Sequence, residues 1–127
     1  MNLEKVVFAF TIILALTLNF GFFVGEIDNP AHHHVYEFYA AMFVNAVATI
    51  LKFGDRSHMG AVLLATSLVA DIQLIAAASV WAFAVHVSGT GLTPNVMASI
   101  VSLAGGALVA NMISVALLTI ETVLLRR

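Results

Sequence analysis

The sequence contains no cysteine, only two prolines and few charged residues. The lack of cysteine excludes disulfides, thiolate chemistry and iron–sulfur ligation. Charged residues make up 9% of the chain, against about 25% in a typical soluble domain. With five Lys and Arg and a net charge of −2 there is no basic patch, so we expect no nucleic-acid partner. The sequence has no nucleophile–base pair, phosphate loop or HExxH motif, and we therefore expect neither enzymatic activity nor a cofactor.

Apolar residues are abundant instead, at 61% of the chain, and the mean hydropathy is +1.04. This composition predicts an integral membrane protein with a single domain over residues 1–127. Four apolar segments predict transmembrane helices at approximately 4–25, 30–53, 58–88 and 94–125. The loops between them are short, so neighbouring helices should be antiparallel. The predicted fold class is an all-α bundle of four transmembrane helices in up-down order.

The second of these segments is the least apolar. Its uncharged stretch, Phe38–Leu51, is short enough to suggest a re-entrant segment. Asp28 or Asn29 can cap a helix, however, and Pro30 suits a first helical position. These signals favour a longer helix that crosses the membrane completely.

The basic residues predict the direction of the helices. They are Lys5, Lys52, Arg56, Arg126 and Arg127, and all fall on one side of a four-span arrangement. The two other connections, 26–37 and 88–95, contain no Lys or Arg. The positive-inside rule then places both termini in the cytoplasm, with the helices in a membrane that we expect to be the bacterial inner membrane.

Four polar residues fall at nearly the same depth. Counting from the ends of each segment places Asn45, Asp71, Gln73 and Asn111 within about two residues, roughly 3 Å, of the midplane. Asp71 has no Lys, Arg or His at its depth, so its carboxyl group must be protonated, bind a cation or face water. The alternative is a protonated Asp71 hydrogen-bonded to Asn45 or Asn111, which only ties helices together.

Helical periodicity assigns further roles to the polar and small residues. Glu37 and Asn45 belong to a polar stripe that either lines a wet path or faces the bundle interior. Asp71 and Gln73 occupy opposite faces of the third helix, which predicts a second subunit against one face and hence a homo-oligomer. The fourth helix carries a ridge of small residues suited to close packing: Ala98, Ser102, Gly106 and Ala110.

The 26–37 connection is rich in histidine and acid. Together with the end of the third helix it supplies Glu26, Asp28, His33, His34 and His86. Such residues can bind a transition metal, sense external pH or concentrate cations at a pore mouth, and a solvated loop is the fourth interpretation. Gly25–Glu37 is also the most distinctive stretch of a chain that, as a whole, resembles small bacterial four-helix membrane proteins of unknown function. That resemblance implies no activity.

Two functions are compatible with these patterns. The first is a homo-oligomeric channel or transporter for a cation or proton, with Asp71 as its central site. The second is a non-transporting accessory subunit of a larger membrane complex, in which the polar groups only join helices. The lipid bilayer is the expected environment in both cases, and another membrane protein is a partner only in the second.

Overall fold

The computed structural model describes residues 3–26, 28–55 and 57–125, and within them the chain is helical with no strand. The elements in chain order are α1 (Leu3–Phe23), the 3₁₀ helix η1 (Pro30–His32), α2 (Val35–Lys52), α3 (His58–Ala82), the π-helix η2 (Phe83–Val87) and α4 (Pro94–Leu125). Arg56, Arg126 and Arg127, on which the prediction of topology partly depends, lie outside the described residues.

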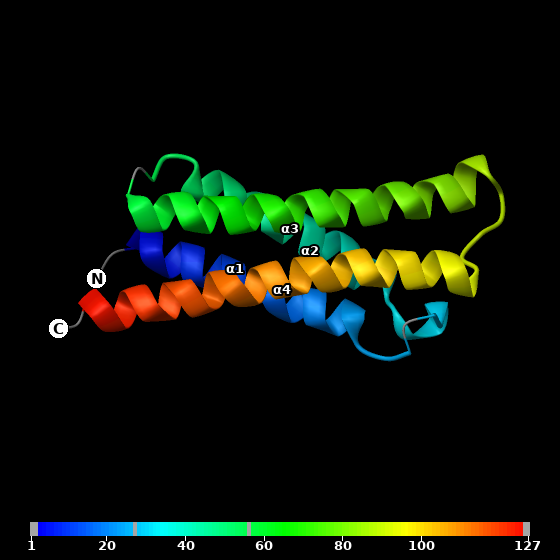
Figure 1. Cartoon of the computed structure of the whole chain (residues 1–127), viewed down its shortest axis with the longest axis horizontal. Helices are drawn as coiled ribbons and strands as arrows, with labels where there is room; N and C mark the ends of the chain where they lie inside the picture. The colour runs from blue at the N-terminus through cyan, green and yellow to red at the C-terminus, as the bar shows by residue number, and fades with distance from the viewer. Residues whose placement is uncertain (1–2, 27, 56, 126–127) are drawn as a thin grey trace.

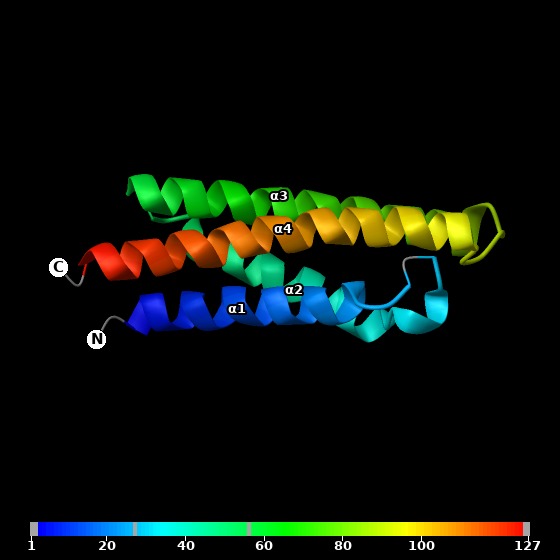
Figure 2. The same cartoon turned by 60° about the horizontal axis from the view of Figure 1, so that its bottom comes forward.

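The four long helices form an antiparallel bundle (Figure 1). Each packs on two neighbours: α1 on α2 and α4, and α3 on α2 and α4. The start of α1, the α2–α3 connection and the end of α4 share one end of the bundle, which we call the lysine end because Lys5 and Lys52 lie there (Figure 1). The opposite end, here the histidine-rich end, carries the 24–34 segment and the α3–α4 loop. Figure 2 shows the α3–α4 hairpin extending beyond the other pair at this end.

Three helical segments are long and apolar enough to cross a membrane: α1, α3 continued by η2, and α4. The exposed face of α3 is correspondingly apolar, with Leu68, Val69, Ile72 and Ile75 all directed away from the bundle. A soluble protein would bury such residues, whereas a lipid environment accommodates them without loss. The chain is therefore a membrane protein. The remaining helix, α2, has 18 residues and two charged ones, Glu37 and Lys52.

Capping side chains explain where several helices begin. The Ser57 hydroxyl accepts a hydrogen bond from the Gly60 N–H at 3.0 Å, and the Thr93 hydroxyl accepts one from Val96 at 3.2 Å. Both follow the usual N-cap geometry, in which a side-chain oxygen satisfies a free N–H of the first turn. The helix that follows Thr93, α4, covers the predicted range 94–125.

The start of α2 differs from the prediction. Asn29 does cap a helix that begins at Pro30, but this helix is η1, and α2 begins only at Val35. His33 and His34 have extended backbones between the two elements, with φ/ψ of −126°/102° and −74°/124°. The break has a physical reason: the ring of His33 is hydrogen-bonded to backbone groups at the end of α1, which prevents a continuous helix from Pro30.

Candidate functional site

Asp71 lies in the α2–α3 interface, where the Thr49 hydroxyl donates a short hydrogen bond to its Oδ2 atom. The side chain is half-buried. Its second oxygen, Oδ1, is buried and has no hydrogen-bond partner within the described part of the chain. Lys52 follows Thr49 on the same helix, but its ammonium group is paired with Asp55 at 3.3 Å and not with Asp71. A buried carboxyl group with one engaged and one free oxygen can hold a proton or receive a further ligand.

The partner of Asp71 is therefore neither of the amides that the sequence suggested. Asn45 is fully buried, and its Nδ2 donates to the Ala41 carbonyl of its own helix at 2.9 Å. Its Oδ1 atom is buried and has no partner among the described residues. Thr49 lies on the polar stripe of this helix but was not among the candidate site residues predicted from the sequence. The available signal was its position one turn after Asn45 on the same polar stripe.

The side chains of that stripe are directed into the bundle. Asn45, Thr49 and Lys52 are all buried, and the Lys52 ammonium lies 4.2 Å from the centre of the Phe8 ring on α1. On the facing helix, Ser67 is buried one turn before Asp71, and its hydroxyl lacks a partner in the described structure. The α2–α3 interface thus holds several polar groups, spaced about one helical turn apart.

Asn111 belongs to a different cluster, between α1 and α4. With its amide oriented by its neighbours, Asn19 donates to the Ala104 carbonyl at 3.3 Å and accepts from the Leu108 N–H at 3.2 Å. The same Asn19 oxygen accepts from the Asn111 amide at 3.3 Å. Both asparagines are fully buried. Asn111 is therefore positioned to join two helices, and no hydrogen bond links it to Asp71 among the described residues.

Gln73 faces α4, where its side-chain amide lies against the backbone of Gly106. The Gln73 amide occupies the space that a Cβ at position 106 would otherwise fill. About two turns along the same interface toward the lysine end, the hydroxyls of Thr66 and Ser114 are 2.5 Å apart. Asp71 of α3 thus contacts α2, and Gln73 of α3 contacts α4, so both faces of α3 are covered within one chain. The argument for a second subunit from these two faces no longer applies.

The predicted ridge of small residues on α4 is only partly used within the chain. Ala110 is buried, and Gly106 and Ala98 are half-buried, whereas Ser102 is exposed. Within this ridge the burial is therefore greatest at Ala110 and least at Ser102.

The histidine-rich end separates the residues that the sequence groups together. Glu26, Asp28, His34 and His86 are exposed, whereas His33 is buried, with its Nδ1 2.5 Å from the Phe22 carbonyl and its Nε2 2.7 Å from the Glu26 carbonyl. The carboxylate of Glu37 lies against the backbone of Gly21 on α1. No three His, Asp or Glu side chains of residues 3–26, 28–55 and 57–125 converge into a group that could hold a metal ion.

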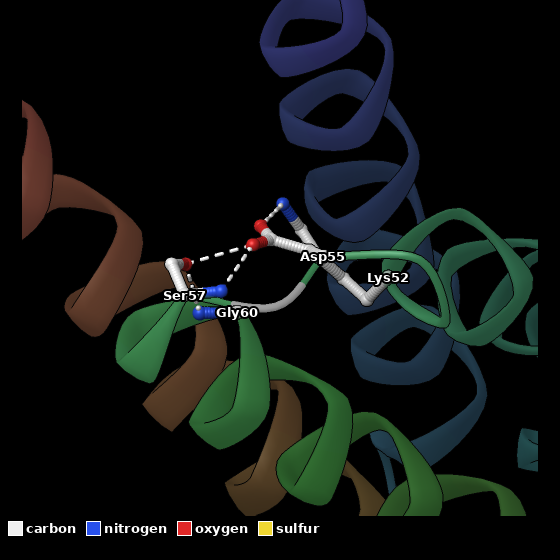
Figure 3. A network of polar contacts seen from close by, with 4 residues as sticks. All are labelled: Lys52, Asp55, Ser57 and Gly60. Atoms are coloured by element: carbon white, nitrogen blue, oxygen red, sulfur yellow. Dashed lines mark hydrogen bonds and ion pairs between the residues drawn. The ribbon is translucent and has the colours of Figure 1, made fainter.

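A polar network closes the α2–α3 connection at the lysine end (Figure 3). The Asp55 Oδ1 atom accepts hydrogen bonds from the Ser57 N–H at 3.0 Å and the Ser57 hydroxyl at 2.7 Å. These bonds, with a smaller contribution from Lys52, hold the pKa of Asp55 below its ordinary value. The network thereby joins the end of α2 to the N-cap of α3.

The comparisons with known proteins assign no activity to the chain. No curated protein and no solved structure matches it significantly. One family profile matches residues 32–122, which include α2, α3 and most of α4 with the site at Thr49 and Asp71. This match covers well over half of the sequence, and the chain belongs to DUF6394, a family of unknown function.

Proposed function

We propose that the chain is a four-span membrane transporter or channel for a proton or small cation, with Asp71 as its exchange site. The observation that carries this proposal is the Asp71 carboxyl group, buried between α2 and α3 with Oδ2 bonded to Thr49 and Oδ1 unpartnered within the described structure. An ionised side chain at this depth costs about 2.5–3.5 kcal/mol on insertion scales, and acids so placed commonly serve ion or proton pathways.

The surroundings of Asp71 favour a proton over a metal cation. Its one bonded neighbour is a hydroxyl group, and no cluster of three possible metal ligands occurs in the described residues. A metal cation requires several oxygen or nitrogen ligands at once, whereas a carboxyl group takes up a proton alone.

Polar groups continue from Asp71 toward both ends of the α2–α3 interface. Since α2 and α3 are antiparallel and meet at Thr49 and Asp71, Asn45 lies about one turn toward the histidine-rich end. Ser67 and Lys52 lie about one turn toward the lysine end. The free polar atoms of Asn45 and Ser67 are buried, and such groups are suited to bind the waters that relay a proton.

The proposed topology has four spans, with the lysine end in the cytoplasm. Two observations support the crossing of α2. The helices α1 and α3 run in the same direction, so the chain between them has to return across the bundle, and α2 occupies that position (Figure 1). Lys5 and Lys52 also share one end, as the positive-inside rule requires. A homo-oligomer remains part of the proposal, supported by the exposed small residue Ser102 on the α4 ridge.

The second candidate is an accessory subunit in which Asp71 has only a structural role. The hydrogen bond from Thr49 favours it, because a protonated carboxyl group bonded across two helices is an ordinary means of joining them. The two candidates differ in one property: transport needs an ionisable group at position 71, whereas a structural tie needs only a hydrogen-bonding one.

Flux measurements in liposomes test the proposal. Purified wild-type protein should dissipate an imposed pH gradient, and Asp71→Asn should abolish most of this flux while the helical content is kept. Glu121→Gln is the matched control, because it removes an acid of α4 that lies outside the α2–α3 interface. Sodium and potassium gradients in the same vesicles distinguish a proton from a small cation. Wild-type flux no greater than that of protein-free liposomes would contradict the proposal.

A further inference from the structure

Two adjacent histidines at the histidine-rich end hold the backbone of a single residue. The Nδ1 atom of His32 accepts a hydrogen bond from the Glu26 N–H at 2.9 Å. The Nε2 atom of His33 lies 2.7 Å from the Glu26 carbonyl, and its Nδ1 lies 2.5 Å from the Phe22 carbonyl. The His33 ring is only 3% exposed, so it has little access to water as an alternative partner.

The two rings require different protonation states. A carbonyl oxygen only accepts hydrogen bonds, and a neutral imidazole has one N–H donor and one acceptor nitrogen. Neutral His33 can therefore satisfy only one of its two carbonyls, and its other nitrogen would face an oxygen lone pair. The doubly protonated imidazolium donates to both. His32, by contrast, must keep Nδ1 unprotonated to accept from Glu26.

We propose that His33 makes the 22–34 segment a pH-sensitive clasp, closed when both ring nitrogens of His33 are protonated and released when one proton is lost. Histidine is the side chain whose charge normally changes between pH 5 and 8. Release removes one of the two hydrogen bonds that the His33 ring makes to the carbonyls of Phe22 and Glu26. This inference does not depend on transport at Asp71.

The other charged and titratable groups at the histidine-rich end are acids, histidines and tyrosines. From the segment itself, from the first turns of α2 and from η2 at the same end of the bundle they are Glu26, Asp28, His32, His34, Tyr36, Glu37, Tyr39 and His86. On the α1 side the ring meets the Phe22 side chain, at 5.4 Å between ring centres, and the Phe22 carbonyl. The sequence has no Lys or Arg between Lys5 and Lys52, and none from position 57 to 125, so no fixed cation opposes the imidazolium.

An aromatic cluster connects the clasp to the bundle. The Phe22 ring contacts His33 on one side and lies 5.0 Å from Phe38 and 6.3 Å from Trp81. The chain contains one tryptophan, so its emission reports on this cluster alone. Opening of the clasp should therefore change the environment of Trp81.

The direct test is nitrogen NMR of the full chain, labelled with ¹⁵N-histidine, in lipid nanodiscs. At about pH 6, one histidine should show two protonated, hydrogen-bonded ring nitrogens, and this signal should be missing from His33→Phe. Near pH 8 one of its two N–H signals should be lost. A single protonated ring nitrogen on His33 at every pH would overturn the proposal.

Trp81 fluorescence tests the consequence in the same nanodiscs. Wild-type emission should change between about pH 8 and 6, and His34→Gln, at an exposed neighbour, should keep that change. His33→Phe should remove it. His33→Gln serves if the Phe variant does not fold, because its amide donates hydrogen bonds without titrating in this range. An unchanged Trp81 titration in the folded His33 variant would overturn the clasp.

Discussion

Thr49 and Asp71 are joined by a hydrogen bond that spans the interface between α2 and α3. Both side chains are removed from water to a large extent, and the remaining Asp71 oxygen has no partner in the described part of the chain. The Thr49 hydroxyl thus orients a carboxyl group whose other oxygen is free to exchange a proton. In the proposed function, this relationship gives Thr49 a positioning role and Asp71 the chemical one.

Removal of the Thr49 hydroxyl should weaken the contact between α2 and α3. Thr49→Val has nearly the same shape, so it tests the hydrogen bond without creating a cavity. We expect the free energy of unfolding to fall by about 1–2 kcal/mol, the range for hydrogen bonds between membrane helices. Unfolding in mixed detergent measures it. Thr119→Val is the control, because Thr119 is exposed and bonds only within its own helix. If Thr49→Val and Thr119→Val lowered the free energy of unfolding by the same amount, the Thr49–Asp71 bond would have no special role in stability.

The asparagine pair between α1 and α4 should behave as one unit. Asn19→Leu removes bonds to Ala104, Leu108 and Asn111, so Asn19→Leu and Asn111→Leu should each lower the stability. Together they should lower it by less than the sum, with a coupling of about 0.6–1.7 kcal/mol. A double-mutant cycle of unfolding measurements gives this number, and Asn95→Ala at an exposed position is the control. Strict additivity would show that the two amides do not interact.

Asp55 should make the start of α3 sensitive to acid. Its pKa is lowered in the folded chain, chiefly by the hydrogen bonds from Ser57. A lowered folded pKa means that this stabilisation is present above the ordinary value of about 3.9 and is lost as the pH falls below it. Amide hydrogen exchange at residues 57–61 should therefore accelerate below about pH 4. Asp55→Asn keeps an acceptor oxygen but does not titrate, and it should remove this acceleration. Acid sensitivity that persists in Asp55→Asn would assign the effect to another group.

The four-span topology predicts where fused reporters are active. Green fluorescent protein fused after Arg127 should fluoresce, since that end of the chain is expected in the cytoplasm. Alkaline phosphatase inserted after Gly89, in the α3–α4 loop, should be active because it would lie outside. Phosphatase activity at the position after Arg127 would contradict four spans.

Features that depend on neighbouring residues could be predicted from the sequence, whereas those that depend on how helices are rotated could not. Ser57 and Thr93 cap their helices through bonds to residues three positions away, so the local pattern is sufficient. The membrane character likewise follows from composition. The start of α2 was misplaced because the contact of His33 with α1 interrupts the helix.

The polar residues in the membrane illustrate the same limit. Their presence and approximate depth follow from counting along each helix. Their partners depend on the register and rotation of one helix against another, which no single-helix pattern contains. For this reason the sequence points to Asp71 as an acid inside the membrane but does not identify Thr49 as its partner, and Asn111 bonds to Asn19 instead of Asp71.

The central claim is that Asp71 exchanges a proton inside the membrane, and proton flux through liposomes containing Asp71→Asn tests it most directly. Asn keeps a hydrogen-bonding side chain of the same size, so the contact with Thr49 can persist while the ionisable group is gone. Our account predicts a folded variant in which the proton flux of the wild type is reduced at least about tenfold, equivalent to about 1.4 kcal/mol in the barrier. Wild-type flux in folded Asp71→Asn would contradict it and leave Asp71 with a structural role.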